Sequence, residues 1–271
     1  MMSLWDALRM NMMISYQELV RTFLKRIAQY LLYLPCVLML TNTVSASVTI
    51  LGSRIIYPAG ALSVDVQLKN NDDIPYVIQT WFDEGDVNAT PAQGAKIPFL
   101  TTPPVFRMQA KAGQVIRVTH TGARDLPQDR ESLYWFNALQ VPPSNLESEK
   151  GQNKMLVMLR TRVKVIYRPA GIGSPKNQLN GLRVNATFDA QKGYGISIEN
   201  PQPWYASLTL IEAEVGGKKH TLTADTVAPF DRQTFWFNNW KTKTAGNGTV
   251  RVWLVNDQGA RINGQYPVSY P

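Results

Sequence analysis

The sequence predicts an all-β protein with two immunoglobulin-like β-sandwich domains, preceded by a signal peptide. Three observations support this fold class. From Ser47 onward, no stretch of the 271-residue chain shows the apolar period of an amphipathic helix. Short runs rich in β-branched and aromatic residues recur instead, about every 10–15 residues, with turn residues between them. This pattern stops at the Pro/Gly-rich stretch 168–178 and then starts again.

The first 46 residues differ from the rest and predict a secretory signal peptide. A mostly apolar run, Ile27–Leu40, follows a basic stretch and precedes small residues that end at Ala46; the basic residues are Arg21, Lys25 and Arg26. This order is typical of a cleaved signal. The apolar run has about 14 residues and contains a proline, which is short for a membrane span. We therefore predict cleavage after Ala46. An uncleaved membrane anchor is the alternative, and a downstream methionine could be the true start.

Removal of residues 1–46 would change the chemistry open to the chain. The sequence has 28 Lys and Arg residues and 20 Asp and Glu residues. Four of the basic residues and two of the acidic residues lie in the predicted signal. The mature net charge is then +6, usually the mark of a solvated surface, so we expect no nucleic-acid partner. The only cysteine, Cys36, is also removed. The mature chain has no thiol for a disulfide, a metal or a nucleophile, and its cores must hold the fold.

The strand pattern divides the mature chain into two domains and a linker. The first domain, 47–168, is expected to contain seven strands: 47–57, 61–70, 75–82, 97–107, 112–120, 131–141 and 154–168. Pro103 and Pro104 interrupt the fourth of these. The linker is 169–178. The second domain, 179–271, is expected to contain seven more: 181–189, 194–199, 204–215, 218–223, 229–237, 248–255 and 261–270. The Gly-Gly pair of "EVGGKKH" predicts a two-residue hairpin turn. Two immunoglobulin-type sandwiches fit this count best, although periodicity alone does not separate a sandwich from a barrel.

One strand has an unusual composition. In "NKMLVMLRTRVKVIYRP", residues 153–169, the second half alternates between apolar or neutral residues and cations, as a half-buried strand does. The first half, Met155–Leu159, is apolar at every position. An apolar strand edge that is left open recruits other chains, and proteins usually protect it with charge or proline. This segment is therefore a candidate for pairing with a partner.

A search for catalytic or metal-binding patterns finds none that is convincing. The two histidines, His120 and His220, each lie in a predicted strand, where a lone histidine is usually structural. No phosphate loop, nucleophile elbow or dinucleotide fingerprint is present. Asp83 and Glu84 lie in a loop-like run and are expected to be solvated. We therefore expect no enzymatic activity, no metal and no cofactor.

The motif "LPQDRESLYWFNALQVPP", residues 126–143, carries a resemblance to a known family. Together with "TTPPVFRMQAKAGQVIRV" before it, "TRVKVIYRP" after it and "WLVNDQGA" at 253–260, it closely resembles the periplasmic chaperones of the chaperone–usher pilus pathway. Ala138 departs from the larger aliphatic residue that is usual there. The resemblance implies two immunoglobulin-like domains set at an angle. It also implies a periplasmic protein that binds pilin subunits and delivers them to an outer-membrane usher.

In this family the last strand of the first domain completes the unfinished sandwich of the subunit. The resemblance places the donor residues at Met155, Val157 and Leu159, which share parity with the core positions Val163 and Val165. Leu156 and Met158 are apolar on the opposite face and favour contact with the subunit or self-pairing of the free protein into a dimer. The loop before this strand has about 11 residues, and with no cysteine pair this indicates the short-loop group of the family.

Charged residues of the family also have counterparts here. The resemblance places the two cations that grip the C-terminal carboxylate of the subunit at Arg54 and Lys164, a pairing that charge-assisted hydrogen bonds make strong. Arg160 and Arg162, on the same strand face as Lys164, are expected to be solvated. A second set, Glu131, Arg168 and Asp257, matches an ion network between the two domains.

The region around Pro75 matches the surface that family members present to the usher. We assign Pro75 and Val77 to this surface, while Tyr76 and Ile78 could equally belong to the core.

Two rival interpretations stay open. One is an exported structural or adhesive protein with two β-sandwich domains, and the other is a secreted β-sandwich hydrolase, which the absence of a catalytic constellation disfavours.

Overall fold

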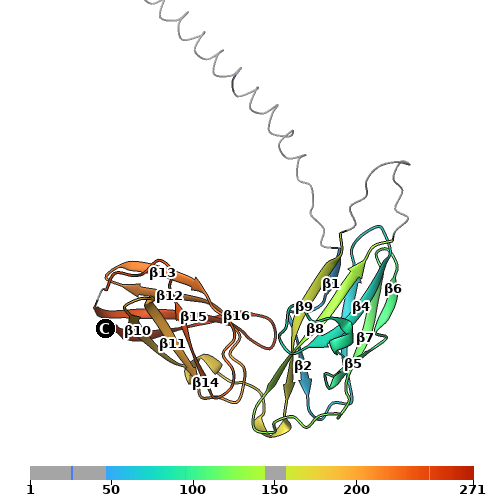
Figure 1. The fold of residues 1–271 in the computed structure, drawn as a ribbon, viewed down its shortest axis with the longest axis horizontal. Helices are drawn as coiled ribbons and strands as arrows, with labels where there is room; N and C mark the ends of the chain where they lie inside the picture. The colour runs from blue at the N-terminus through green and yellow to red at the C-terminus, as the bar shows by residue number, and fades with distance from the viewer. Residues whose placement is uncertain (1–25, 27–46, 95, 144–156, 244) are drawn as a thin grey trace, which may run out of the picture. The chain divides into compact units, whose positions relative to one another are not determined.

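The computed structural model describes residue 26 and residues 47–94, 96–143, 157–243 and 245–271. The predicted signal peptide therefore lies almost wholly outside the described residues. Among the residues that are described, no helix is both long and apolar enough to cross a membrane. Strands make up more than half of the described residues and are arranged as two sandwiches (Figure 1).

The first sandwich consists of two sheets that together use strands β1 to β9. One sheet has the order β1-β3-β7-β5, with β1 (Val48–Ile50), β3 (Val64–Asn70), β7 (Gly113–His120) and β5 (Phe99–Thr102). The other has the order β2-β9-β8-β4-β6, with β2 (Arg54–Pro58), β9 (Leu159–Arg168), β8 (Ser132–Val141), β4 (Tyr76–Asp83) and β6 (Val105–Met108). A single helical turn, α2 (Pro91–Gly94), follows β4.

Alternate residues of these strands form the core between the two sheets. The buried side chains include Tyr57, Ile78, Ile116, Phe136 and Val165, each at most 1% exposed. Because strand side chains alternate between faces, the residues that alternate with these core positions lie on the outer faces of the two sheets. The period-2 pattern that predicted the strands is therefore the pattern that separates the core from the outer surface.

The second sandwich has a three-stranded and a four-stranded sheet. The first has the order β10-β11-β14, with β10 (Arg183–Asp189), β11 (Gly193–Asn200) and β14 (Asp231–Trp236). The second has the order β13-β12-β15-β16, with β13 (Lys218–Thr223), β12 (Leu208–Val215), β15 (Gly246–Val255) and β16 (Arg261–Tyr270). Short 3₁₀ turns at Ala170–Ile172 and Gln178–Gly181 precede β10. Gly216 and Gly217 form the predicted hairpin turn, with φ of 56° and 75°.

The predicted fold class, all-β with two immunoglobulin-like domains, is confirmed. Two predicted strands, 47–57 and 97–107, are wrong as single elements. The segment 97–107 divides at Pro103 and Pro104 into β5, which pairs with β7, and β6, which pairs with β4 in the other sheet. The segment 47–57 divides in the same way. It is interrupted at Gly52, whose φ is 97°, and its two halves join different sheets: β1 pairs with β3, and β2 pairs in parallel with β9. Glycine adopts this left-handed backbone at little cost, so the chain can cross from one sheet to the other there. The crossing places β2 beside β9.

Gly248 offers a test of the packing in the second sandwich. It faces Val215 of β12, and a methyl group added there would collide with the backbone carbonyl of Glu214 and lie 2.8 Å from the ring of Tyr270. We expect Gly248→Ala to lower the free energy of unfolding by about 1–3 kcal/mol, because neither neighbour can move freely. Urea denaturation followed by tryptophan fluorescence measures this. Gly60→Ala is the control, since nothing lies within 4 Å of its added methyl; equal midpoints for the two variants would contradict the described packing.

Candidate functional site

Strand β9 has a neighbour on both sides along only half of its length. On one side, β8 pairs with it from Leu159 to Tyr167. On the other side, β2 pairs only with Lys164–Arg168. Within the described part of the chain, no strand pairs with Leu159–Val163 on the side away from β8. The backbone of this half is therefore available to another strand.

Apolar side chains gather where β9 is open. Val157, Met158 and Leu159 are each at least half exposed, whereas Val163 and Val165, on the parity of Leu159, are buried in the core. The apolar row of the core thus continues past the end of the sandwich into solvent. Met155, also predicted to belong to this row, and Leu156, predicted for the opposite face, lie outside the described residues.

The two predicted anchor cations lie side by side. Arg54 begins β2 and pairs in register with Lys164 of β9. Arg54 donates from Nη1 to the carbonyl oxygen of Val255 at 2.8 Å, and its buried Nε has no hydrogen-bond partner in the structure. Lys164 donates to the hydroxyl of Thr226 and lies 4.0 Å from a carboxylate oxygen of Asp225.

The electrostatics of this pair favour binding of an anion. Burial lowers the pKa of Lys164, with the charge of Arg54 lowering it further and Asp225 opposing the shift. Burial also lowers the pKa of Arg54, against the attraction of Asp257 and Glu131. Both shifts mean that the two charged forms are poorly solvated. A carboxylate placed between these cations would relieve that cost and receive charge-assisted hydrogen bonds.

Glu131, Arg168 and Asp257 come together in a buried ion network. Arg168 donates from Nε to Glu131 Oε1 at 2.7 Å, and from its two terminal nitrogens to Asp257 at 2.7 and 2.9 Å. Glu131 also accepts the backbone N–H of Tyr205 at 2.7 Å. Burial raises the pKa of Glu131, although these donors oppose the shift, so its ionised form depends on them. The network joins the start of β8 and the end of β9 to the second sandwich.

The prediction that Asp83, Arg160 and Arg162 are solvated is wrong. The side chain of Asp83, at the end of β4, is only 2% exposed, and those of Arg160 and Arg162 are 25% and 17% exposed. Arg162 donates from Nε to Asp83 at 3.0 Å, and Arg160 lies 3.6 Å from the same carboxylate. Burial opposes ionisation of Asp83, but hydrogen bonds from Arg162, Asn137 and the backbone of Gly85 outweigh it and hold its pKa below the usual value. Of the four residues predicted to be solvated, Glu84 alone is exposed, and it forms an ion pair with Arg124.

Several residues of this region were not singled out from the sequence. Thr226, Asp225 and Val255 contact the anchor cations from the second domain, and no local pattern announces contacts over such distances along the chain. Asn137, by contrast, has a signal that could have been used. It is a polar residue in the middle of the mostly apolar and aromatic strand β8, and such a buried amide needs partners.

The residues assigned to the usher divide between the core and the surface. Tyr76 and Ile78 belong to the core, whereas Val77 is 43% exposed on the outer face and Pro75 is half-buried. Val105 of the neighbouring strand β6 is 52% exposed. Val77 and Val105 therefore add apolar surface to the outer face of β4 and β6.

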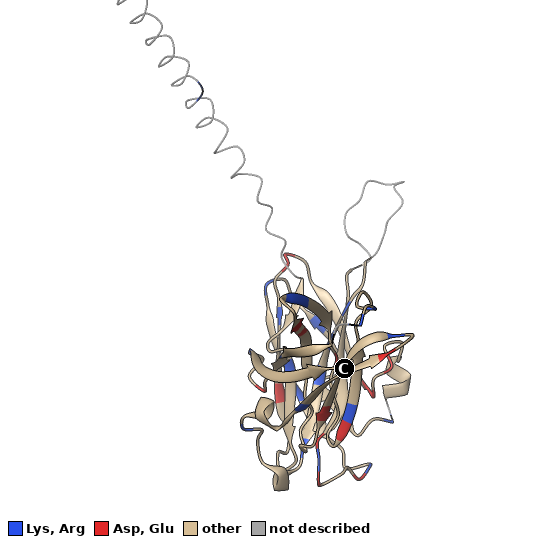
Figure 2. Ribbon diagram, turned by 90° about the vertical axis from the view of Figure 1, so that its left-hand side faces the viewer, with Lys and Arg blue, Asp and Glu red and all other residues tan. Residues whose placement is uncertain are grey.

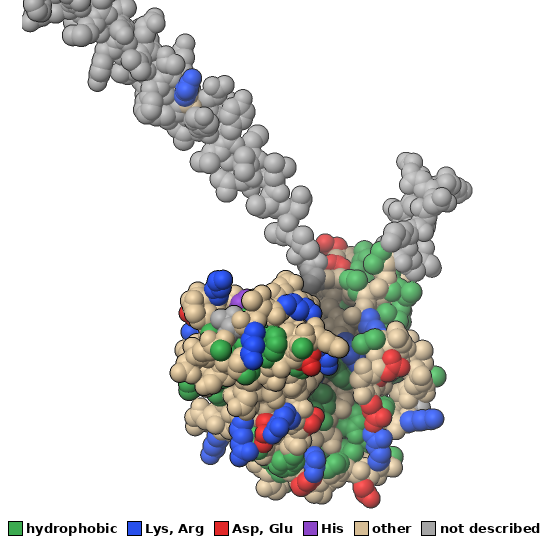
Figure 3. All heavy atoms as spheres, turned by 60° about the vertical axis from the view of Figure 1, so that its left-hand side comes forward, with side chains coloured by type: hydrophobic (Ala, Val, Ile, Leu, Met, Phe, Trp, Pro, Cys, Tyr) green, Lys and Arg blue, Asp and Glu red, His purple; other side chains and the backbone are tan. Residues whose placement is uncertain are grey.

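Charged residues occur on strands and loops alike (Figure 2). On the face in Figure 3, lysines and arginines alternate with acidic, polar and apolar side chains and form no continuous basic patch among the described residues.

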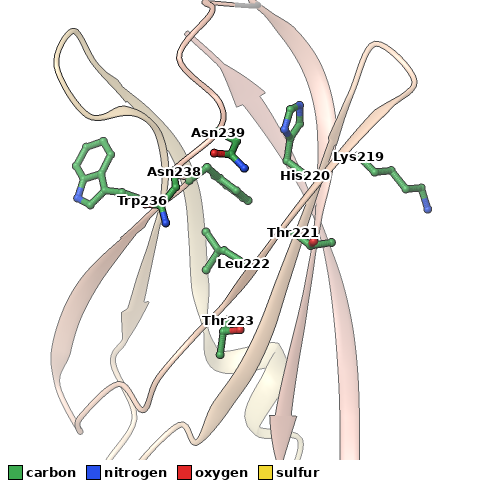
Figure 4. Close-up of a pocket in the computed structure, with 9 residues that line it drawn as sticks. Lys219, His220, Thr221, Leu222, Thr223, Trp236, Asn238 and Asn239 are labelled. Atoms are coloured by element: carbon green, nitrogen blue, oxygen red, sulfur yellow. The ribbon is translucent and has the colours of Figure 1, made fainter.

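The two histidines are packed against aromatic rings. His120 lies among Tyr57, Phe99 and Tyr167, and burial lowers its pKa. His220 stacks on Trp240 with 4.0 Å between ring centroids. His220 also borders a hollow of about 520 Å³ between β13 and β14, lined by Leu222, Trp236 and Asn238 among others (Figure 4). No group of three potential metal ligands occurs among the described residues.

Loss of the arginine in the ion network should be costly. Arg168→Met would leave Glu131, 1% exposed in its side chain, without its charged partner. We expect the free energy of unfolding to fall by about 3–5 kcal/mol in urea denaturation, since an unpaired buried carboxylate is strongly unfavourable. Arg117→Met is the matched control. It removes an exposed partner of Asp65, at 3.7 Å, and should cost less than about 1 kcal/mol. A cost for Arg168→Met as small as that of the control would show that the network contributes little.

Comparison with known proteins agrees with this architecture. Residues 47–173 match the family described as "Pili and flagellar-assembly chaperone, PapD N-terminal domain", and residues 182–266 match "Pili assembly chaperone PapD, C-terminal domain". The chain is 37% identical to a probable fimbrial chaperone, YadV, of Escherichia coli over 222 residues, which cover 81% of this chain and 89% of the relative. It is 38% identical to the chaperone protein HifB of Haemophilus influenzae over 226 residues, or 81% and 87% of the two chains.

Solved structures give the same result. The crystal structure of the YadV chaperone superimposes with a TM-score of 0.70 at 32% identity, covering 82% of this chain and all of the other. A complex of the Salmonella enterica SafA pilin with the SafB chaperone matches with a TM-score of 0.65 at 26% identity, over 84% of this chain and 98% of the other. The resemblance seen in the sequence is thus confirmed: the chain belongs to the PapD family of pilus-assembly chaperones, which are not enzymes.

Proposed function

We propose that this chaperone works in the periplasm, binds pilin subunits by donor-strand complementation and delivers them to an outer-membrane usher. The observation that carries the proposal is the half-covered strand β9. Its open half displays apolar side chains, and the cation pair Arg54 and Lys164 lies where the covered half begins. An open strand edge that leads to an anion site can bind the last strand of another chain, because the C-terminal carboxylate of that strand would reach the two cations.

The open edge can accept one strand of the subunit. Backbone groups of Leu159–Val163 would form the ladder, and apolar side chains on one face would fill the space that the subunit leaves in its own core. Val157 and Leu159 supply two of these side chains, and Met155, outside the described residues, would supply a third. Burial of each contributes about 1.5–3 kcal/mol before the costs of ordering are subtracted.

The arrangement of β2 suggests the direction of the bound strand. β2 runs parallel to β9 and begins at Arg54, opposite Lys164. A subunit strand on the open half would occupy the same row as β2 and meet it end to end. If its carboxylate reaches the cations, its C-terminus points toward β2, and it runs parallel to β9. The two cations would then fix the register, because only the last residue of a chain carries that carboxylate.

The same open edge could pair with a second copy of the chain when no subunit is present. The apolar outer surface at Val77 and Val105 is the candidate contact for the usher, with Pro75 at its border. It lies on β4 and β6, which are two and three positions from β9 in the order of the sheet, so both partners could bind at once.

The anchor is tested by Arg54→Ala and Lys164→Ala. Each removes one of two convergent charges, and we expect capture of pilin to fall at least about tenfold, the cost of one charge-assisted hydrogen bond. Tagged mature protein would be co-expressed in the periplasm with fimbrial subunits of its own organism, and the captured subunit measured by mass spectrometry. Arg117→Ala, a surface charge on the other sheet, should capture as much as wild type. Normal capture by both anchor variants would refute the anchor, and absence of capture by wild type would refute the chaperone–subunit proposal.

The usher surface is tested by Val77→Asp. A carboxylate on this apolar surface should weaken binding of the chaperone–subunit complex to the usher at least about tenfold, because a charge would have to be desolvated there. Binding can be followed by surface plasmon resonance with purified usher. Val115→Asp is the control, because Val115 is a similarly exposed valine on β7 of the opposite sheet. Subunit capture should remain normal in both variants; equal usher binding by both would place the usher contact elsewhere.

A further inference from the structure

We propose that Asp83, Arg160 and Arg162 form a clamp that holds the open half of β9 in a single register in the free protein. This inference deepens the proposed function, because that half of β9 is the segment proposed to enter the subunit. These three are positioning residues: they would act through β9 and not by touching the subunit's carboxylate. The proposal is carried by the contacts that connect β9 across β8 to β4.

The carboxylate of Asp83 is the centre of the clamp. Its Oδ2 accepts hydrogen bonds from Arg162 Nε at 3.0 Å and from Asn137 Nδ2 at 2.7 Å, while its Oδ1 accepts a second bond from Arg162 and the backbone N–H of Gly85, the latter at 2.7 Å. Arg162 thus binds the carboxylate with two nitrogens, a geometry that fixes position as well as charge.

Arg160 is held by the same group of residues. Its Nε donates to Asn137 Oδ1 at 2.9 Å, its Nη1 donates to the carbonyl oxygen of Val87 at 2.6 Å, and its Nη2 lies 3.6 Å from Asp83 Oδ2. Asn137 therefore links the two halves of the clamp, accepting from Arg160 and donating to Asp83. Side chains from β9, β8 and β4 are joined in one network.

Two tryptophans on the outer face complete the arrangement. The guanidinium of Arg160 lies over the ring of Trp81 at 4.9 Å from its centroid, and that of Arg162 lies over Trp135 at 4.1 Å. Each arginine is thus oriented both by an aromatic ring and by hydrogen bonds. Lys164 lies near the same ring of Trp135, at 5.3 Å, so the clamp and the anchor cations share one outer face.

The location of the two arginines explains why such a clamp is useful. Both belong to Leu159–Val163, the part of β9 that β2 does not support. A slip of β9 by two residues would keep its apolar residues facing the core, so the apolar pattern alone does not exclude it. In one direction the slip would put Met158 in place of Arg160 and so remove the donor to Asn137. In the other direction it would put Lys164 in place of Arg162 and so remove the two-nitrogen contact with Asp83. Either slip therefore loses one guanidinium of the clamp. It would also separate Lys164 from Arg54, its partner in register. The clamp thereby protects the anion site as well as the donor row.

Hydrogen–deuterium exchange of the mature protein, without subunit, tests the clamp. In Asp83→Asn we expect exchange of 157–163 to quicken about 10–100-fold, the effect of losing charge-assisted hydrogen bonds on local opening. Exchange of β2 and of the second sandwich should not change. Asp65→Asn, which removes an exposed carboxylate from the opposite sheet, should match wild type.

A second comparison separates positioning from general stability. Val250→Ala, in the core of the second sandwich, destabilises the protein without touching the clamp, and it should leave exchange of 157–163 unchanged. If Asp83→Asn does not fold, Arg162→Lys keeps the charge but loses the two-nitrogen contact and should show the same local effect more weakly. Uniform acceleration over the whole first sandwich, or no acceleration at 157–163, would overturn the clamp.

Subunit capture distinguishes failure of the clamp from failure of the proposed function. If the clamp acts as proposed, Asp83→Asn should capture at least about fivefold less pilin than Asp65→Asn. In part of the Asp83→Asn molecules the open strand would be out of register and unable to bind. If exchange in Asp83→Asn is faster only at 157–163 and the wild type captures no pilin, the clamp is supported and the chaperone–subunit proposal is rejected. If exchange in Asp83→Asn is faster only at 157–163 but this variant captures pilin normally, the claim that the clamp helps β9 to pair with the subunit is overturned.

Discussion

The first sandwich is organised around a strand that its own sheet supports along only part of its length. β2 begins at Arg54 and so covers β9 only from Lys164 onward. If β2 were longer, the edge would be closed and the apolar residues at 157–159 would have no role. If β2 were shorter, the cation pair would lose one member. The crossing of the chain at Gly52, between β1 and β2, therefore sets both the length of the open edge and the position of the anion site.

An open apolar edge is a binding site, but it can also pair unspecifically with other chains. Other features of the structure limit such pairing. The outer face of β9 carries cations in place of a second apolar face, and these are bound to Asp83, Asn137 and two tryptophans. At its other end, β9 finishes in Arg168, which Glu131 and Asp257 hold. The strand is thus fixed by ionic contacts at both ends, while its backbone stays free along one edge. Affinity for a partner strand can then come from backbone pairing without prior ordering of β9.

Much of the fold could be predicted from the sequence because strand periodicity is local information. β3, β4, β7, β8 and the hairpin at Gly216 and Gly217 follow the alternation and turn residues that predicted them. The split of 47–57 could not be predicted in this way, because it depends on which sheet each half joins. The family motif led to Arg54 and Lys164, which the structure places next to each other, but not to their neighbours from the second domain.

Asp83 shows most clearly where sequence reasoning fails. Followed by Glu84 and Gly85, it has the composition of a solvated turn, yet its carboxylate is buried. Its partners Asn137 and Arg162 are 54 and 79 residues away in the chain, so only the order of β4, β8 and β9 in the sheet brings them together. Buried charges of this kind depend on tertiary partners, and a local pattern contains no information on them.

The central claim is that a pilin strand adds to the open half of β9. Hydrogen–deuterium exchange of the wild-type mature protein, with and without bound pilin, tests it most directly. The account predicts strong protection of the 157–163 amides when pilin is bound and little change at 164–168, which β2 already covers. Pilin binding without any new protection at 157–163 would contradict it and show that the subunit binds another surface.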